Sequence, residues 1–300
     1  MYISEIRYKN RHYLITGSNG LIGNEIRNQL IIGIRNEFGF SSNDIYINDY
    51  AQIPNSSFQL HVAGLMRHWE NLFFSKATIF LAHGYGGFSI NEAEEQMQKD
   101  AFLQLIQLLN KAMNGDLADK ISIYLISSLG ALSSKLTSPY RRLILFKEYQ
   151  IQQIKADLKI VRLPSLWGFT WKNGRVRPKG LLASLIYSSF NSNTATIYGS
   201  LSTLRNYLHV KSAVKSVLII AKQRRIKIAN VRSYEFHTIQ SLIQHLKQSV
   251  SGRHLSIKLM SSISALNSES HIFLPKSGES VVVYNKMSYE IKDEWRKLCS

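Results

Sequence analysis

Short apolar runs alternate, over the first half of the chain, with longer stretches in which apolar residues recur every three to four positions. The short runs predict buried strands, and the longer stretches predict amphipathic helices. Strands that alternate with helices in this way indicate a parallel sheet with helices on both faces. In chain order, the expected elements are strand Tyr13–Thr16, helix Asn24–Ile34, strand Asp44–Asn48, strand Phe58–His61, helix Leu65–Phe74, strand Ala77–Ala82, helix Glu92–Met113, strand Ile121–Ile126, helix Pro139–Asp157 and strand Leu158–Leu163.

A glycine-rich turn joins the first expected strand to the first expected helix. Glycines spaced three apart permit a tight turn and let a pyrophosphate approach the backbone N–H groups at the helix N-terminus. This strand–turn–helix context predicts an α/β fold of the Rossmann type, a doubly wound parallel sheet that binds a dinucleotide at the turn. The residues of the turn are Gly17, Ser18, Asn19, Gly20, Leu21, Ile22 and Gly23.

Asp49 follows the second expected strand and bears on the choice of cofactor. A carboxylate at that position accepts hydrogen bonds from an adenosine ribose and repels a 2′-phosphate, which favours NAD over NADP. Two alternatives stay open, because Asp49 can be a simple turn residue and Asn48 can take the same place. We therefore expect NAD, with NADP as the alternative.

The pattern changes after Leu163, where glycine and proline interrupt a loop-rich stretch that continues into short helical and strand segments. We therefore expect an NAD(P)-binding Rossmann domain over residues 1–163. A smaller substrate-binding lobe is expected over residues 164–300, with interleaving between the two as an open alternative. In doubly wound folds, ligands bind outside the carboxyl ends of the strands.

The formal net charge of +17, from 37 basic and 20 acidic residues, favours anionic partners. The basic residues are spread along the chain, so we expect nucleotide phosphates rather than nucleic acid as the partner. The single cysteine, Cys299, excludes an internal disulfide and a cysteine metal cluster. No close histidine pair indicates a metal site.

No apolar run reaches the roughly 18 residues that would predict a membrane span. Residues 1–11 are mixed and charged, unlike a signal peptide. We therefore expect a cytoplasmic protein.

Five stretches, in order, resemble one known family. They are Thr16–Gly23 (TGSNGLIG), Phe80–Ala82 (FLA), Ile126–Ser128 (ISS), Val161–Gly168 (VRLPSLWG), and Ile197–Gly199 followed by Arg205–Val210 (IYG, RNYLHV). Together they resemble the extended short-chain dehydrogenases/reductases, specifically the NAD-dependent sugar-nucleotide epimerase/dehydratase family. The resemblance covers residues from about 12 to at least 220. Its last stretch is the most specific, because it is typical of members that bind nucleotide sugars.

The resemblance implies roles for several side chains. Ser128 hydrogen-bonds the reacting hydroxyl or keto oxygen of the sugar, and Tyr140 transfers its proton while hydride passes to or from the nicotinamide. Arg205 contacts the nucleotide diphosphate. The family also implies a homodimer built on the helix Glu92–Met113 and the helix that carries the tyrosine.

The loop after the fourth expected strand lies beside the cofactor in that family. Ala82, His83 and Gly84 occupy this place. They are therefore candidate cofactor-lining residues, although an ordinary loop structure is an equal alternative.

The chain departs from the family at the catalytic lysine. The family pattern is Tyr-x-x-x-Lys, but the residue four positions after Tyr140 is Ile144. Three accounts stay open: Lys147 substitutes for the lysine, or the register is shifted so that Leu143 replaces the tyrosine, or the lysine is lost. Without a nearby positive charge, a tyrosine of pKa about 10 is a poor base at neutral pH.

Two functional hypotheses follow. The first is an NAD(P)-dependent epimerase, dehydratase or reductase acting on a nucleotide-diphosphate sugar in surface polysaccharide synthesis, with Ser128, Tyr140 and Lys147 as catalytic residues. The second is a dinucleotide-binding sensor or scaffold of the same fold that has lost turnover, and the missing lysine motivates it.

Overall fold

The computed structural model describes residues 3–8, 11–38, 46–50, 76–83, 90–112, 118–132, 138–172, 175–191, 194–198, 200–249, 256–260, 279–284 and 287–299. The expected strand Phe58–His61, the expected helix Leu65–Phe74 and Gly84 lie outside these residues.

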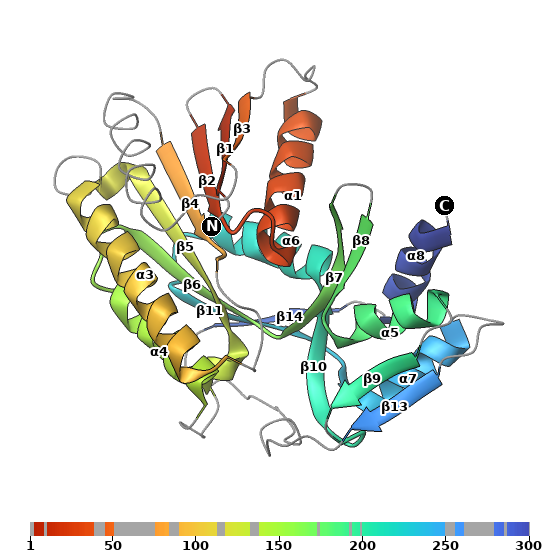
Figure 1. The fold of residues 1–300 in the computed structure, drawn as a ribbon. Coiled ribbons are helices and arrows are strands. Elements are labelled where there is room, and N and C mark those ends of the chain that lie inside the picture. The colour runs from red at the N-terminus through yellow and green to blue at the C-terminus, as the bar shows by residue number, and fades with distance from the viewer. Residues whose placement is uncertain are drawn as a thin grey trace.

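An eight-stranded sheet forms the centre of the molecule, in the order β14-β11-β6-β5-β4-β2-β1-β3 (Figure 1). Neighbours from β14 to β2 pair in parallel, whereas β1 runs antiparallel to both β2 and β3. The mostly parallel α/β sheet predicted from the alternation of elements is therefore confirmed. The strands are β1 (Ile3–Tyr8), β2 (Arg11–Thr16), β3 (Tyr46–Tyr50), β4 (Lys76–Leu81), β5 (Ile121–Ser128), β6 (Asp157–Leu163), β11 (Ile228–Ser233) and β14 (Glu279–Val283).

Helices cover both faces of this sheet (Figure 1). On one face, α1 (Leu21–Phe38) and α6 (Val210–Lys222) bury Ile26 and Val217 against the strands. On the other face, α3 (Glu92–Ala112) and α4 (Pro139–Ile151) bury Phe102 and Ile151. The parallel strands are thus apolar on both sides, which explains their short continuous apolar runs.

Helix α4 is shorter than its predicted range of Pro139–Asp157. It ends at Ile151, and the N–H of Ile154 then donates to the carbonyl of Ile151 at 3.1 Å in a tight turn. This turn brings Asp157 into register with Ser122 at the start of β6. The prediction was too long because apolar residues keep a helical spacing beyond Ile151, although the chain has already left the helix there.

The first strand, β1, was not predicted. It inserts between β2 and β3, with Ser4 paired to both Ile15 and Asp49. Ile3 and Ile6 are fully buried in it. Because strands lie about 4.8 Å apart, β3 stands about 10 Å from β2 rather than next to it.

The remaining elements build a smaller lobe around the buried Trp167. Its four-stranded sheet has the order β12-β10-β7-β8, and β9 and β13 form a parallel pair. The segment beyond residue 164 is interleaved, because α6, β11 and β14 return to the main sheet. A boundary between residues 163 and 164 therefore does not separate the two sheets. The lobe contains β7 (Ser165–Lys172), β8 (Arg175–Lys179), α5 (Leu181–Phe190), β9 (Thr194–Tyr198), β10 (Leu204–His209), β12 (Phe236–Thr238), α7 (Ile239–Ser249), β13 (Ser256–Met260) and α8 (Met287–Cys299).

Among the described helices, none combines the length and the apolar character that crossing a membrane requires.

Candidate functional site

The glycine turn lies at the carboxyl end of β2 and leads directly into α1. The Gly20 N–H donates to the Gly17 carbonyl at 2.9 Å, and Gly17 has a positive φ of 70°. A Cβ on Gly17 would lie 2.7 Å from the Ala82 carbonyl oxygen, and one on Gly23 would lie 2.3 Å from the Gly17 carbonyl oxygen. Side chains at Gly17 and Gly23 are therefore excluded by the backbone itself.

The remaining residues of the turn differ in exposure. Ser18 is buried, Asn19 is exposed, and Leu21 and Ile22 pack partly buried against the core. The turn presents the N-terminus of the 18-residue helix α1, where backbone N–H groups and the helix dipole favour an anion. These residues fit the pyrophosphate of a dinucleotide.

Ala82 and His83 lie beside this turn, at the end of β4. The Ala82 N–H donates to Thr16 Oγ1 at 3.2 Å, and His83 Nδ1 lies 2.8 Å from the same oxygen. Burial lowers the pKa of His83 to about 3, so its imidazole is neutral at pH 7. Thr16 therefore ties the two candidate cofactor-lining residues to the start of the glycine turn, a contact that sequence reasoning missed.

Asp49 lies in β3, and the backbone of this strand is paired with β1. The inserted strand places Asp49 one strand further from the glycine turn than adjacent Rossmann strands would. Its role at an adenosine ribose stays a prediction, as does the choice of NAD over NADP.

Ser128 and Tyr140 are brought together at the carboxyl end of β5. Ser128 ends the strand, and a 3-10 turn over Leu129–Leu132 follows, in which the Gly130 N–H donates to Ser128 Oγ at 3.1 Å. Tyr140 is the second residue of α4, which Ser138 caps by accepting the Arg141 N–H at 3.2 Å. Burial raises the pKa of Tyr140, and a hydrogen bond with Ser128 only partly opposes that shift.

The place of the missing lysine is filled by Ile144. A Cβ on Gly130 would lie 3.3 Å from Ser128 Oγ, 3.5 Å from Tyr140 Cε1 and 3.8 Å from Ile144 Cδ1, so these three side chains surround one small space. Gly130, which sequence reasoning did not single out, leaves this space open. Ile144 is buried there. An apolar side chain therefore stands one helical turn after Tyr140, where a positive charge would lower the pKa of the phenol.

Lys147 lies between α4 and α3, nearly one turn further along. Its Nζ is 3.4 Å from Gln98 Oε1 and 5.7 Å from the centre of the Phe102 ring. Burial lowers the pKa of Lys147 to about 8. The charge of Lys147 helps to lower the pKa of His83, whereas the shift of Tyr140 has burial and Ser128 as its causes. Lys147 thus contacts Gln98 and Phe102 of α3 rather than the phenol.

A buried ion pair fixes α4 against β6, two turns of the helix after Tyr140. Arg162 of β6 contacts Glu148 through two hydrogen bonds, at 2.9 and 2.6 Å, and Ser127 donates to the same carboxylate at 2.5 Å. Glu148 and Arg162 are only 4% and 7% exposed. This network joins α4, β5 and β6 and so positions Ser128 opposite Tyr140.

The two arginines that follow Tyr140 point to other partners. Arg142 forms an ion pair with Glu95 of α3 at 2.6 Å, and Arg141 donates to the Ala131 carbonyl at 3.5 Å. Neither of these contacts involves the Tyr140 hydroxyl.

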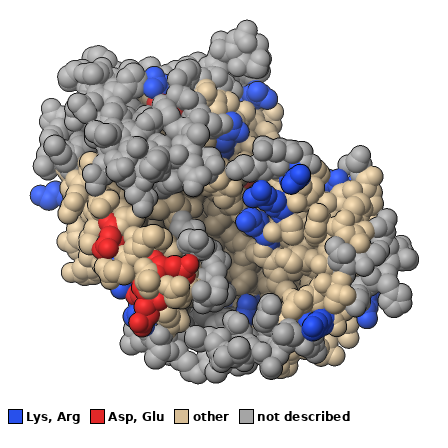
Figure 2. All heavy atoms as spheres, viewed as in Figure 1, with Lys and Arg blue, Asp and Glu red and all other residues tan. Residues whose placement is uncertain are grey.

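Arg205 is half-buried on β10 in the smaller lobe, with His237 of β12 as its register partner. The strand β8 adds a second basic feature, because Arg175, Arg177 and Lys179 all lie on its exposed face. Figure 2 shows a hollow near the middle of this view, with basic side chains gathered along one side of it. The smaller lobe therefore offers positive charge suited to an anionic ligand.

The fold is that of NAD-dependent sugar-nucleotide epimerases and dehydratases. The UDP-glucose 4-epimerase of Thermus thermophilus, solved with NAD, matches with a TM-score of 0.65 and 14% identity over 93% of this chain and 97% of that chain. TunA, an NAD-dependent NDP-hexosamine 5,6-dehydratase of tunicamycin biosynthesis, matches with a TM-score of 0.66 and 14% identity over 97% and 98% of the two chains.

A third solved structure shows how widely this fold is used. L-threonine 3-dehydrogenase from Trypanosoma brucei matches with a TM-score of 0.61 and 11% identity over 94% and 95% of the two chains. No protein-family model matches the chain, and no curated protein matches it. The site, rather than the fold, must therefore support any statement about substrate.

Proposed function

We propose that this protein is an NAD-dependent epimerase, dehydratase or reductase that acts on a nucleotide-diphosphate sugar. The juxtaposition of Ser128 and Tyr140 around Gly130, on the same sheet edge as the glycine turn, carries this proposal. NADP is the alternative cofactor. Surface polysaccharide synthesis is the kind of process that uses such a substrate.

Each group of residues has a defined part in the proposal. Residues 17–23 hold the pyrophosphate, and Ala82 and His83 line the cofactor. Bound NAD supplies the hydride acceptor. Tyr140 removes the proton of the sugar hydroxyl, and Ser128 orients that hydroxyl through its own hydrogen bond. Arg205 contacts the diphosphate.

The same geometry makes neutral pH unfavourable for the proton transfer. Desolvation raises the pKa of the partly buried Tyr140, and the buried Ile144 contributes no charge. Only a small fraction of Tyr140 is phenolate at pH 7. The proposed reaction is therefore slow at neutral pH and faster in alkaline solution. Lys147 acts from the side of the site where His83 lies, because both side chains approach the Phe102 ring.

The protein is proposed to work as a homodimer through α3 and α4. These helices pack against each other on one face of the sheet, and Met97 and Tyr149 on them are 50% and 64% exposed. Exposed apolar side chains of this size suit a helix-to-helix interface.

A second candidate function rests on Ile144. If the loss of the lysine removed turnover, the glycine turn would still bind a dinucleotide, and the protein would act as a sensor or scaffold. This candidate predicts tight NAD binding with no chemistry on any nucleotide sugar.

One experiment separates the two candidates. Purified protein is incubated with NAD and a panel of UDP-sugars at pH 7 and pH 9.5; NAD binding is followed by calorimetry and products by mass spectrometry. Turnover that is lost in Tyr140→Phe and kept in Tyr289→Phe supports the enzyme. Tyr289 is the matched control because it is exposed on α8, away from the site and from the proposed dimer helices. NAD binding without product at either pH would refute the enzyme and leave the sensor.

A further inference from the structure

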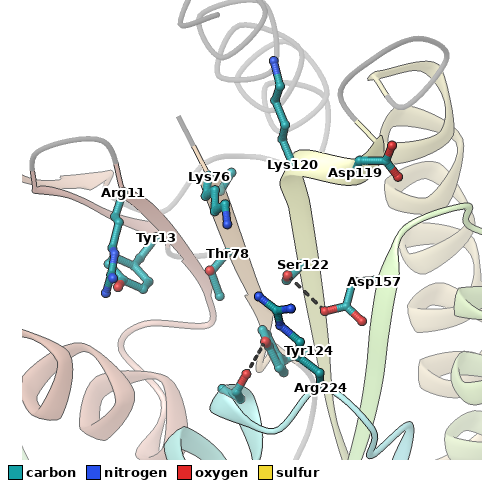
Figure 3. A pocket seen from close by; sticks show the side chains of 12 residues that line it. Arg11, Tyr13, Lys76, Thr78, Asp119, Lys120, Ser122, Tyr124, Asp157 and Arg224 are labelled. Carbon is teal, nitrogen blue, oxygen red and sulfur yellow. Dashed lines mark hydrogen bonds between the residues drawn. The ribbon is translucent and has the colours of Figure 1, made fainter. Parts of the chain in front are cut away.

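A cavity of about 480 Å³ opens at the amino end of the main sheet. Its walls come from the first residues of β2, β4, β5 and β6 and from the loop after α6 (Figure 3). Arg11 lies at this end of β2, whereas Thr16 lies at the other end, beside the glycine turn. At about 3.3 Å per residue, the two ends are about 16 Å apart. The cavity is therefore separate from the candidate active site.

Basic residues from neighbouring strands stand side by side at this edge. Arg11 of β2 is the register partner of Lys76 of β4, and Lys120 precedes the first residue of β5, the next strand. Like charges at adjacent strand positions repel each other. Arg224 approaches from the loop after α6. Figure 3 shows Lys76 and Arg224 directed toward the middle of the cavity, with Arg11 at its side and Lys120 extending away.

Of the two carboxylates in the wall of this cavity, Asp119 and Asp157, the second already has partners. Asp157 accepts from Ser122 at 3.2 Å and pairs with Lys227 at 3.1 Å. The last carbonyls of α6 are covered as well: Lys159 Nζ donates to those of Ile220 and Ala221 at 3.3 and 3.2 Å. The Ala221 carbonyl also accepts from the Tyr124 hydroxyl at 2.9 Å.

Three of the cations at this edge have no such partners. Arg11, Lys76 and Arg224 are exposed, and none of them pairs with an acidic side chain within the described part of the chain. Three such cations around one concave space, against the carboxylate of Asp119, leave an excess of positive charge that suits an anion with more than one negative charge.

We propose that this cavity binds a phosphate-bearing small molecule, held by Arg11, Lys76 and Arg224. A volume of about 480 Å³ lies within the range of small-molecule sites. The carboxylates of Asp119 and Asp157 in the wall favour a compact ligand with hydroxyl groups over an extended phosphate backbone that would pass close to them. A nucleotide and a sugar phosphate share this chemistry. The site stands apart from the proposed reaction and does not depend on it.

The test uses inorganic pyrophosphate as the probe, titrated by calorimetry at constant ionic strength. We expect the double variant Lys76→Gln/Arg224→Gln to bind it at least tenfold more weakly than the unaltered protein. The matched control is Lys215→Gln/Lys292→Gln, which removes the same charge from exposed positions on α6 and α8 and should bind normally. Arg11→Gln alone should weaken binding in the same direction.

Equal binding by the two double variants would show diffuse surface charge or another site and overturn the proposal. ATP and glucose 6-phosphate, titrated in parallel, identify which source of phosphate the site prefers. A 12-nucleotide single-stranded RNA that binds more tightly than any of these, and is lost in the same variant, would also overturn it in favour of a nucleic-acid surface. Because the readout is binding at the cavity, the result is independent of turnover at Tyr140.

Discussion

The side chains of Ser128 and Tyr140 border one small space at the carboxyl end of β5, and the buried Ile144 lines the same space. In the family that the sequence resembles, a lysine supplies positive charge at that position. Here the phenol has the Ser128 hydroxyl on one side and the apolar side chain of Ile144 on another. The pKa of Tyr140 therefore becomes the property that governs the proposed chemistry.

The rate of nicotinamide reduction should rise with pH. Because burial raises the pKa of Tyr140 above its usual value near 10, the phenolate fraction grows about tenfold per pH unit up to that value. Single-turnover absorbance of reduced nicotinamide, followed from pH 7 to pH 10, should show this slope. A rate that is constant between pH 7 and pH 9 would contradict the assignment of Tyr140 as the base.

Replacing Ile144 with lysine should move that profile to lower pH. A positive charge near the phenol lowers its pKa by about 1–3 units, so the rate at pH 7 should rise by about 10- to 1000-fold. Ile144→Met is the control, because it keeps an apolar side chain of similar size. Identical profiles for the two variants would show that this position does not act on Tyr140.

Gly17→Ala should abolish NAD binding and destabilise the fold by about 1–3 kcal/mol. The new Cβ would meet the Ala82 carbonyl oxygen at 2.7 Å, at a φ of 70°. Gly33→Ala is the contrasting variant, because Gly33 lies within α1 with nothing within 4 Å of its Cβ position. It should stabilise by about 0.5–1 kcal/mol. Urea unfolding measures the change in stability, and calorimetry measures NAD binding. If Gly17→Ala changed neither the free energy of unfolding nor NAD binding, the turn would not be strained as described.

Glu148→Gln should lower the free energy of unfolding by about 3–5 kcal/mol, because it leaves the buried Arg162 without its charged partner. The control pair is Lys227 and Asp157, whose side chains are 66% and 43% exposed. Lys227→Gln should cost less than about 1 kcal/mol. Urea unfolding that gives similar values for the two variants would contradict the positioning role of the buried pair.

The smaller lobe should lose stability in acid through Glu294. Burial alone would raise the pKa of this carboxyl, but hydrogen bonds with His209 and Lys297 outweigh it and lower the pKa to about 2. The stabilisation is therefore complete above the usual carboxyl pKa of about 4.5 and is lost as the pH falls toward 2. As the pH is lowered from 6 to 2.5, the melting temperature of Glu294→Gln should fall less steeply than that of the unaltered protein. Parallel curves would show that Glu294 is not the group responsible.

Local sequence was enough to predict the features that depend on neighbouring residues. The glycine spacing from Gly17 to Gly23 predicts a turn because backbone crowding excludes a Cβ at both ends, and the structure shows such crowding. The alternation of apolar runs predicts the parallel sheet because its strands are buried on both faces. Ser128 and Tyr140 could be paired from a family resemblance because each stands at the end of an element that the apolar pattern locates.

Other features depend on contacts between segments that are far apart in the chain. The pairing of β1 with both β2 and β3 moves Asp49 away from the glycine turn, and no local pattern encodes that order. Lys147 faces Gln98 and Phe102 because α4 packs on α3, so its distance from Tyr140 along the sequence did not reveal its direction. Arg11, Lys76 and Arg224 are widely separated in the chain, and only the alignment of strand ends brings them around one cavity. Periodicity reports which face of an element is buried, whereas strand order and helix packing arise from the complementary surfaces of the whole chain.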